Sequence, residues 1–209
     1  MSAAASGRSR LRDTAAGYGW ISIALHWITG VAVLVLLFVG SSIASAEDRA
    51  GMVLLHTSIA LSSYAFLWAR IVWRVRTGHP GPLPNQRRSF FLVGKAVHYA
   101  TLAALALMLV SGPLMVWSGG ESIGMFGWFS IPSPMSAHHA LRDFLHGVHA
   151  TSATVILIAV VLHLGGVYKH AAFDQDGTFG KMLVAAKPGE QAPAAKPAID
   201  RAAVDLGGQ

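Results

Sequence analysis

The chain has 209 residues, of which 53% are hydrophobic and only 12% are charged, about half the charged fraction of an ordinary soluble domain. It contains no cysteine, which excludes disulfides, cysteine-ligated iron–sulfur clusters and haem attached through a Cys-x-x-Cys-His motif. The net charge of +6 is not accompanied by interleaved basic and aromatic residues, so we expect no nucleic-acid partner.

Four stretches without Lys, Arg, Asp or Glu are apolar enough to cross a bilayer, which takes about 20 residues: residues 14–46, 50–69, 96–120 and 144–168. In lipid such stretches are stable as helices, because every backbone group must be paired internally. We therefore predict an all-α, transmembrane four-helix bundle over residues 19–173. Residues 1–18 are predicted to be a flexible basic lead, and residues 174–209 a disordered tail rich in Ala and Pro.

A fifth stretch, residues 122–141, contains two glycines and two prolines that interrupt a helix. It is predicted to be an interfacial loop with Phe126, Trp128 and Phe129 at headgroup level.

The basic residues predict the orientation of the bundle. They are frequent before the first span, between the second and third, and after the fourth, whereas the two opposite loops carry only Arg49 and Arg142 beside several acids. Because cytoplasmic loops of membrane proteins are rich in Lys and Arg, both termini are predicted to be cytoplasmic.

Four histidines lie inside these spans at two matching depths. His149 and His163 are fourteen residues apart on the fourth span, which returns to nearly the same helix face and separates them by roughly 21 Å along the axis. With the chain crossing the membrane four times, His26 shares the inner level with His163, and His56 shares the outer level with His149. Each level thus receives one histidine from each of two helices.

Ionisable residues inside a membrane usually have a function. Two imidazoles that approach from opposite sides suit a haem whose iron needs two axial ligands, and such a six-coordinate iron transfers electrons. We therefore predict two b-type haems, with His26, His56, His149 and His163 as ligands of the haem iron. The simpler interpretation, four histidines that only form hydrogen bonds between helices, explains the matching depths less well.

Two glycines repeat the same spacing. Gly40 follows His26 by fourteen residues and Gly112 follows His98 by fourteen, so both fall at the outer level, where a missing side chain lets a flat ligand approach the backbone.

Further residues are candidates for supporting roles. Arg70 lies fourteen residues after His56; it is predicted either to bind a haem propionate or merely to mark the cytoplasmic end of its helix. His98 is a candidate for a propionate, a quinone carbonyl or a proton path, and it competes with His26 as inner ligand. His146 competes with His149. A separate metal cluster of His138, His139 and His146 is a minority interpretation, since no cysteine or carboxylate accompanies them at an informative spacing.

The sequence resembles the bacterial cytochrome b561 family of four-helix, di-haem inner-membrane proteins. The matching pieces cover residues 18–173 and include Ile23-Ala24-Leu25-His26-Trp27, His56 with Arg70 and Arg74, His98 with Gly112, and His149 with His163 and His170. The loop Met125-Phe126-Gly127-Trp128-Phe129-Ser130-Ile131-Pro132 is also similar. The resemblance implies haem ligation by His26, His56, His149 and His163, electron exchange with ubiquinone or another quinone, and location in the bacterial inner membrane. Ala150 stands where the family often has Glu.

Several functions remain open at this point. The expected function is transmembrane electron transfer between two b-type haems and membrane quinone, by a cytochrome that acts as a quinone-linked oxidoreductase. Alternatives are a superoxide-to-quinone oxidoreductase, whose donor is a small reductant, and a haem membrane anchor for a separate dehydrogenase or other redox protein. From a different class, a histidine-based metal or proton transporter is disfavoured, because the predicted midplane stretches are continuous and lack ionisable groups. Lipid is an expected partner in every case.

Overall fold

The computed structural model describes residues 10–14, 17–78, 88–174 and 179–186. Residues 1–9 of the predicted lead and residues 187–209 of the predicted tail lie outside these ranges.

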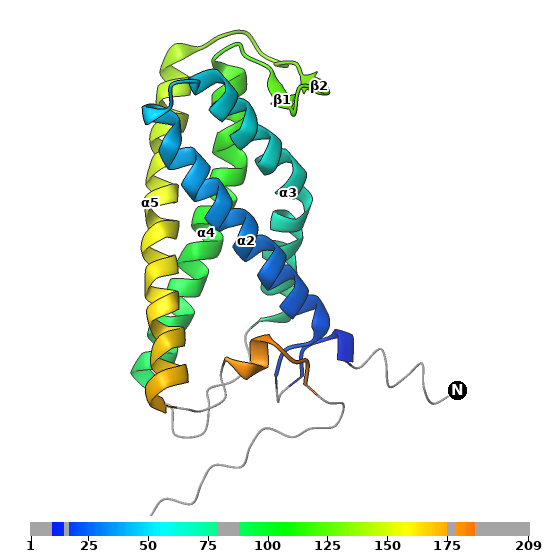
Figure 1. The fold of residues 1–209 in the computed structure, drawn as a ribbon, viewed down its shortest axis with the longest axis vertical. Coiled ribbons are helices and arrows are strands. Elements are labelled where there is room, and N and C mark those ends of the chain that lie inside the picture. The colour runs from blue at the N-terminus through cyan, green and yellow to red at the C-terminus, as the bar shows by residue number, and fades with distance from the viewer. Residues whose placement is uncertain (1–9, 15–16, 79–87, 175–178, 187–209) are drawn as a thin grey trace, which may run out of the picture.

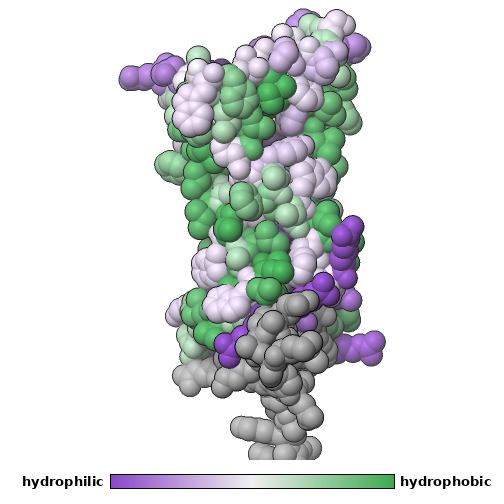
Figure 2. All heavy atoms as spheres, turned by 90° about the vertical axis from the view of Figure 1, so that its right-hand side faces the viewer, coloured by the Kyte–Doolittle hydropathy of each residue, from purple (hydrophilic) through white to green (hydrophobic). Residues whose placement is uncertain are grey.

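Four long helices form the body of the protein (Figure 1): α2 (Trp20–Ser42), α3 (Arg49–Thr77), α4 (Arg88–Ser118) and α5 (His139–Lys169). All four are long and apolar enough to cross a membrane, which confirms the predicted all-α transmembrane bundle. On the face shown in Figure 2, apolar side chains extend along the length of the bundle, and hydrophilic ones gather towards its ends. The helices run beyond the charge-free stretches, so that Arg74 and Arg76 lie in the last turn of α3.

The helices pack as two hairpins, α2 against α3 and α4 against α5. The hydrophobic core lies at mid-height, where α3, α4 and α5 meet. Its buried side chains are Leu67, Ile71, Leu102, Ala104, Leu105, Leu109 and Ile156. This core carries no ionisable group, as the sequence predicted for the midplane.

A proline inside α4 leaves one carbonyl unpaired, and a hydrogen bond to this carbonyl links the two helix hairpins. Pro113 has no N–H, so the carbonyl of Leu109, four residues earlier, has lost its helical donor. The hydroxyl of Tyr64 on α3 donates to this carbonyl at 3.1 Å. The hydrogen bond replaces the missing one and ties α3 to α4 near the core.

At one end of the bundle, here called the hairpin end, the segment between α4 and α5 forms a small β-hairpin. Strand β1 (Ile123–Met125) pairs antiparallel with β2 (Phe129–Ile131). Phe126 and Gly127 both have positive φ, and the N–H of Trp128 donates to the Met125 carbonyl at 2.8 Å, as in a type I′ turn. The predicted non-spanning loop is thus an ordered hairpin with its aromatic side chains exposed.

The β-hairpin is fixed to α3 close to His56. The N–H of Phe126 donates to Ser58 Oγ at 2.7 Å, and Thr57 Oγ1 donates to the carbonyl of Gly124 at 3.1 Å. Ser58 is fully buried. These bonds hold the loop over the helix that carries His56.

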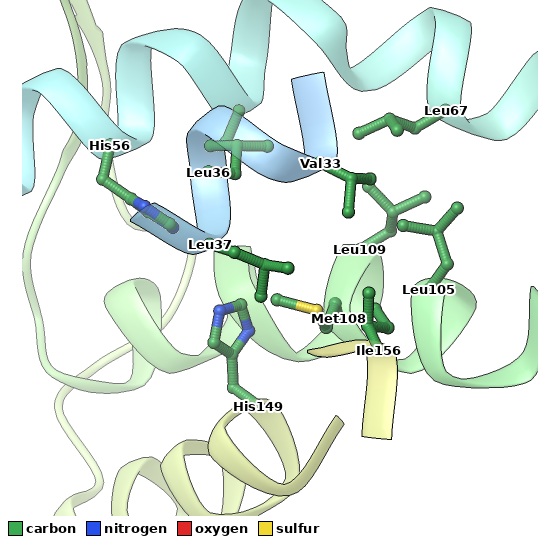
Figure 3. A pocket seen from close by; sticks show the side chains of 11 residues that line it. Val33, Leu36, Leu37, His56, Leu67, Leu105, Met108, Leu109, His149 and Ile156 are labelled. Atoms are coloured by element: carbon green, nitrogen blue, oxygen red, sulfur yellow. The ribbon is translucent and has the colours of Figure 1, made fainter. Parts of the chain in front are cut away.

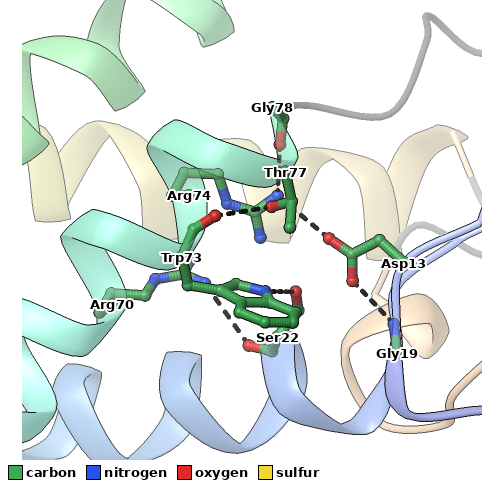
Figure 4. A network of polar contacts seen from close by, with 8 residues as sticks. All are labelled: Asp13, Gly19, Ser22, Arg70, Trp73, Arg74, Thr77 and Gly78. Atoms are coloured by element: carbon green, nitrogen blue, oxygen red, sulfur yellow. Dashed lines mark hydrogen bonds and ion pairs between the residues drawn. The ribbon is translucent and has the colours of Figure 1, made fainter. Parts of the chain in front are cut away.

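The opposite end, here called the terminus end, is closed by the segments that flank the helices (Figure 4). The carboxylate of Asp13 accepts a hydrogen bond from the Gly19 N–H at 2.9 Å and forms an ion pair with buried Arg74 at 3.5 Å. Arg74 also donates to the Gly78 carbonyl at 2.7 Å and lies over the ring of Tyr18. The start of the chain is thereby attached to the end of α3.

Residues 179–186 return to the beginning of α2. The indole N–H of Trp27 donates to the Met182 carbonyl at 2.9 Å, and the N–H of Ala186 donates to the Tyr18 carbonyl at 3.0 Å. Trp27 directly follows His26 in the chain, so the described part of the C-terminal segment packs beside the terminus-end site.

Candidate functional site: two histidine pairs between the helix hairpins

The structure brings together the four intramembrane histidines as two pairs. At the terminus end, the ring of His26 on α2 faces that of His163 on α5, with 5.9 Å between ring centroids. At the hairpin end, His56 on α3 faces His149 on α5, at 6.4 Å. Each pair therefore joins one helix hairpin to the other, and α5 contributes to both.

The spacing of the rings suits a shared metal ion. Two nitrogen–metal bonds of about 2.0 Å, with about 1.1 Å from each nitrogen to its ring centre, place the ring centres about 6.2 Å apart. Both observed distances lie within 0.3 Å of that value. The same kind of pair recurs at both levels of the bundle, each time with one histidine from α5 and one from the other helix hairpin.

Glycines accommodate the rings of the hairpin-end pair. A Cβ at Gly40 of α2 would lie 3.1 Å from His56 Cε1, and one at Gly112 of α4 would lie 3.3 Å from His149 Cε1. The sequence singled out both glycines for this level. Their role in the structure is to let each imidazole lie against the backbone of the preceding helix.

An apolar cavity of about 60 Å³ extends from the hairpin-end pair towards the core (Figure 3). Apart from His56 and His149, its walls are aliphatic side chains and Met108. Such a lining suits the hydrophobic ring of a porphyrin, and offers nothing to a hydrated ion.

Arg70 lies beside the terminus-end pair. Its guanidinium is buried and donates to the carbonyl of Ser22, one helical turn before His26, at the long distance of 3.5 Å. Its charge acts on both His26 and His163. Figure 4 also shows the indole N–H of Trp73 donating to Ser22 Oγ at 2.7 Å, which fixes α3 against α2 at this level.

The competing histidines occupy other positions. His98 is half-buried on α4, and its ring lies edge-on to Tyr99 at 6.2 Å between centroids. His146 is exposed, and among the described residues no group of three or more His, Cys, Asp or Glu side chains could hold a metal ion. The minority interpretation of a cluster of His138, His139 and His146 therefore has no support in the described structure.

Sequence reasoning did not identify some of the residues near the site. Ser111 Oγ lies 3.3 Å from His149 Nδ1, and Asp13 and Tyr18 complete the polar network around Arg74. The position of Ser111, directly before a glycine already singled out, was an available signal. No pattern in the sequence connects Asp13 to a helix end 61 residues later.

The residues present fit haem b. The paired imidazoles have the required separation, glycines leave room beside two of them, and the cavity is apolar. The Nδ1 edge of His56 lies against the backbone of Gly40, which leaves Nε2 as the nitrogen available to a metal. His26, His56 and His149 are half-buried and His163 is exposed. A four-helix membrane bundle with opposed imidazoles between its helices defines the class of membrane-bound b-type cytochromes.

The chain belongs to the prokaryotic cytochrome b561 family, whose model matches residues 17–184. It is also similar to "Cytochrome b561 homolog 2" of Escherichia coli (strain K12), with 31% identity over 175 residues that cover 82% of this chain and 93% of that protein. The resemblance noted in the sequence is thereby confirmed. Membership makes the chain a bacterial membrane protein that transfers electrons by means of b-type haem.

Proposed function

We propose that the chain conducts electrons across the membrane between two b-type haems, each held by one histidine pair, and exchanges them with membrane quinone. The observation that carries this proposal is the pair of imidazole separations, 5.9 Å for His26 with His163 and 6.4 Å for His56 with His149. The haem iron supplies one-electron redox chemistry when bound. A haem held by one of these histidine pairs would have no position left for a substrate, which favours electron transfer.

The protein's own contribution is to hold the two sites at fixed separation in an apolar medium. His163 follows His149 by fourteen residues on α5, or about 21 Å along the helix axis. The core between them consists of buried apolar side chains, which offer no polar path to protons or metal ions.

Arg70 is proposed to bind a propionate of the terminus-end haem. Its buried guanidinium has one long hydrogen bond to a carbonyl. A side chain that only marked a cytoplasmic helix end would extend towards water, whereas Arg70 is 6% exposed. A carboxylate next to it would supply the charge-assisted partner that a buried guanidinium needs.

The quinone is proposed to react near the terminus end, with His98 as a candidate contact to its carbonyl. His98 lies at the third residue after Lys95 on the terminus-end portion of α4. We propose further that this end faces the cytoplasm. Among the described residues, the terminus end carries most of the basic side chains, including Arg12, Arg76 and Lys169, whereas the hairpin end carries acids beside Arg49 and Arg142. Basic residues are more frequent on the cytoplasmic side of membrane proteins.

The ligand assignment is tested by His163→Ala and His149→Ala in protein expressed with ample haem supply. Each variant is expected to lose one of two haems, so that the haem content per chain falls by half, and the remaining haem keeps its reduced-minus-oxidised spectrum. Retention of both haems by either variant contradicts the assignment. His146→Ala is the matched control on the same helix and keeps both.

Quinone exchange is tested by mixing the oxidised protein in nanodiscs with a short-chain ubiquinol and following haem reduction. Reduction is expected in the wild type, and a slower rate with unchanged haem content in His98→Ala. Each quinol is also poised at a potential below the reduction potentials of the haems. If the haems stay oxidised with both ubiquinol and menaquinol under these conditions, the quinone proposal is wrong.

A further inference from the structure

The two hairpin-end histidines pack in the same way, each against a glycine of the other helix in its own helix hairpin. His56 of α3 lies against Gly40 of α2, with a would-be Cβ 3.1 Å from Cε1 and 3.4 Å from Nδ1. His149 of α5 lies against Gly112 of α4, with the corresponding distances 3.3 and 3.5 Å. In both cases the glycine lies on the helix that precedes the histidine, and the Nδ1 edge of the ring faces it.

The two helix hairpins differ in the residue that precedes the glycine. Val39 precedes Gly40, and Ser111 precedes Gly112; both side chains are buried, at 5% and 2% exposure. Ser111 Oγ lies 3.3 Å from His149 Nδ1.

His56 has no such support. Its Nδ1 is buried and lacks a hydrogen-bond partner in the described part of the chain, and a valine side chain cannot provide one. The two imidazoles of one pair are therefore chemically unequal, although their packing against glycine is the same.

We propose that Ser111 is a positioning residue that sets the electron affinity of the hairpin-end haem through His149. The inference rests on the proposed function, in which His149 binds iron through Nε2. The ring proton is then on Nδ1, and Ser111 Oγ accepts it. This bond fixes the tautomer and the orientation of the ring, and it makes the imidazole a stronger electron donor.

A more strongly donating ligand stabilises the oxidised iron, so Ser111 lowers the reduction potential of the hairpin-end haem. His56, without an acceptor at Nδ1, contributes no equivalent effect. Ser111 thus helps to determine which of the two haems holds the electron.

The test removes the hydroxyl at residue 111, adds a hydroxyl at residue 39, and measures both haem potentials by redox titration of the holoprotein. In Ser111→Ala the hairpin-end potential is expected to rise by the effect of one hydrogen bond, about fivefold in the reduction equilibrium or about 40 mV for a one-electron couple. In Val39→Ser, a hydroxyl beside His56 Nδ1 lowers the same potential. The terminus-end potential stays constant in both.

Ser111→Thr retains the hydroxyl and keeps the wild-type potential. Ser41→Ala is the matched control, because Ser41 is exposed and only donates to the carbonyl of Phe38 on its own helix. Haem content and the low-spin electron paramagnetic resonance signal are recorded for every variant.

The inference is overturned if Ser111→Ala leaves both potentials unchanged, or if Ser111→Thr shifts them as Ser111→Ala does. The inference is also overturned if Ser111→Ala loses haem and Ser111→Thr loses it as well. His149→Ala is measured in parallel: if that variant keeps both haems, the proposed function has failed, whereas loss of one haem there with an unchanged Ser111→Ala potential rejects this inference alone.

Discussion

Gly40→Ala is the substitution that tests the hairpin-end site most finely, because it adds one methyl group beside a proposed ligand. The new Cβ would lie 3.1 Å from His56 Cε1, whereas non-bonded carbon atoms are at their optimum about 3.5–4.0 Å apart. His56 must therefore move by several tenths of an ångström or more. Metal–ligand distances tolerate only about 0.2 Å.

The expected cost is that of a small overpacking in a tight site, about 1–3 kcal/mol. If this cost falls on haem binding, the affinity of the hairpin-end site drops by about 5- to 150-fold. Gly112→Ala introduces a milder contact of 3.3 Å with His149 and has a smaller effect. Gly30→Ala, on the same helix as Gly40, meets nothing within 4 Å and serves as the control.

The assay is the haem content per chain together with the redox titration of each haem. The expected order of loss at the hairpin end is Gly40→Ala, then Gly112→Ala, with Gly30→Ala equal to the wild type and the terminus-end haem unaffected in all three. Full haem content and wild-type potentials in Gly40→Ala would refute the reasoning, as would an equal loss in Gly30→Ala.

Three further substitutions test contacts elsewhere in the bundle. Asp13→Asn leaves buried Arg74 without its carboxylate and is expected to destabilise the protein by about 1–3 kcal/mol, seen as a lower melting temperature in detergent. Tyr64→Phe removes the donor to the Leu109 carbonyl that Pro113 leaves unpaired; we expect a loss of about 1–2 kcal/mol with unchanged haem potentials, and an unchanged melting temperature would contradict this role. Burial raises the pKa of Tyr18 above its ordinary value of 10.0. The folded state then holds that proton more tightly than the unfolded state, so this contribution to stability is complete below pH 10 and is lost as the pH rises through the folded-state pKa. Tyr18→Phe abolishes that part of the alkaline decline, and an identical pH profile for the variant would count against it.

The spans and the pairing of the histidines follow from the sequence, because both depend on properties local to one helix. Hydropathy fixes which segments cross the bilayer, and the rise of a helix fixes the depth of each residue. Equal depth favours His26 with His163 and His56 with His149, and the structure brings these pairs together. Gly40 and Gly112 were found by the same periodicity.

Other features depend on how the helices are rotated and on segments outside them, which periodicity does not specify. The contact of Ser111 with His149 requires the relative rotation of α4 and α5. The ion pair of Asp13 with Arg74 closes a loop of 61 residues. The ordered β-hairpin depends on Ser58, a buried serine of α3 that accepts from the Phe126 N–H, and nothing in the loop itself identifies that partner.

The most direct test of the central claim is the haem-to-chain ratio of the purified protein, measured together with its electron paramagnetic resonance spectrum in the oxidised state. Two haems per chain, both low-spin and with no high-spin signal, are expected if each iron is bound by one histidine pair. A ratio of one, or a persistent high-spin signal in intact protein, would contradict the account.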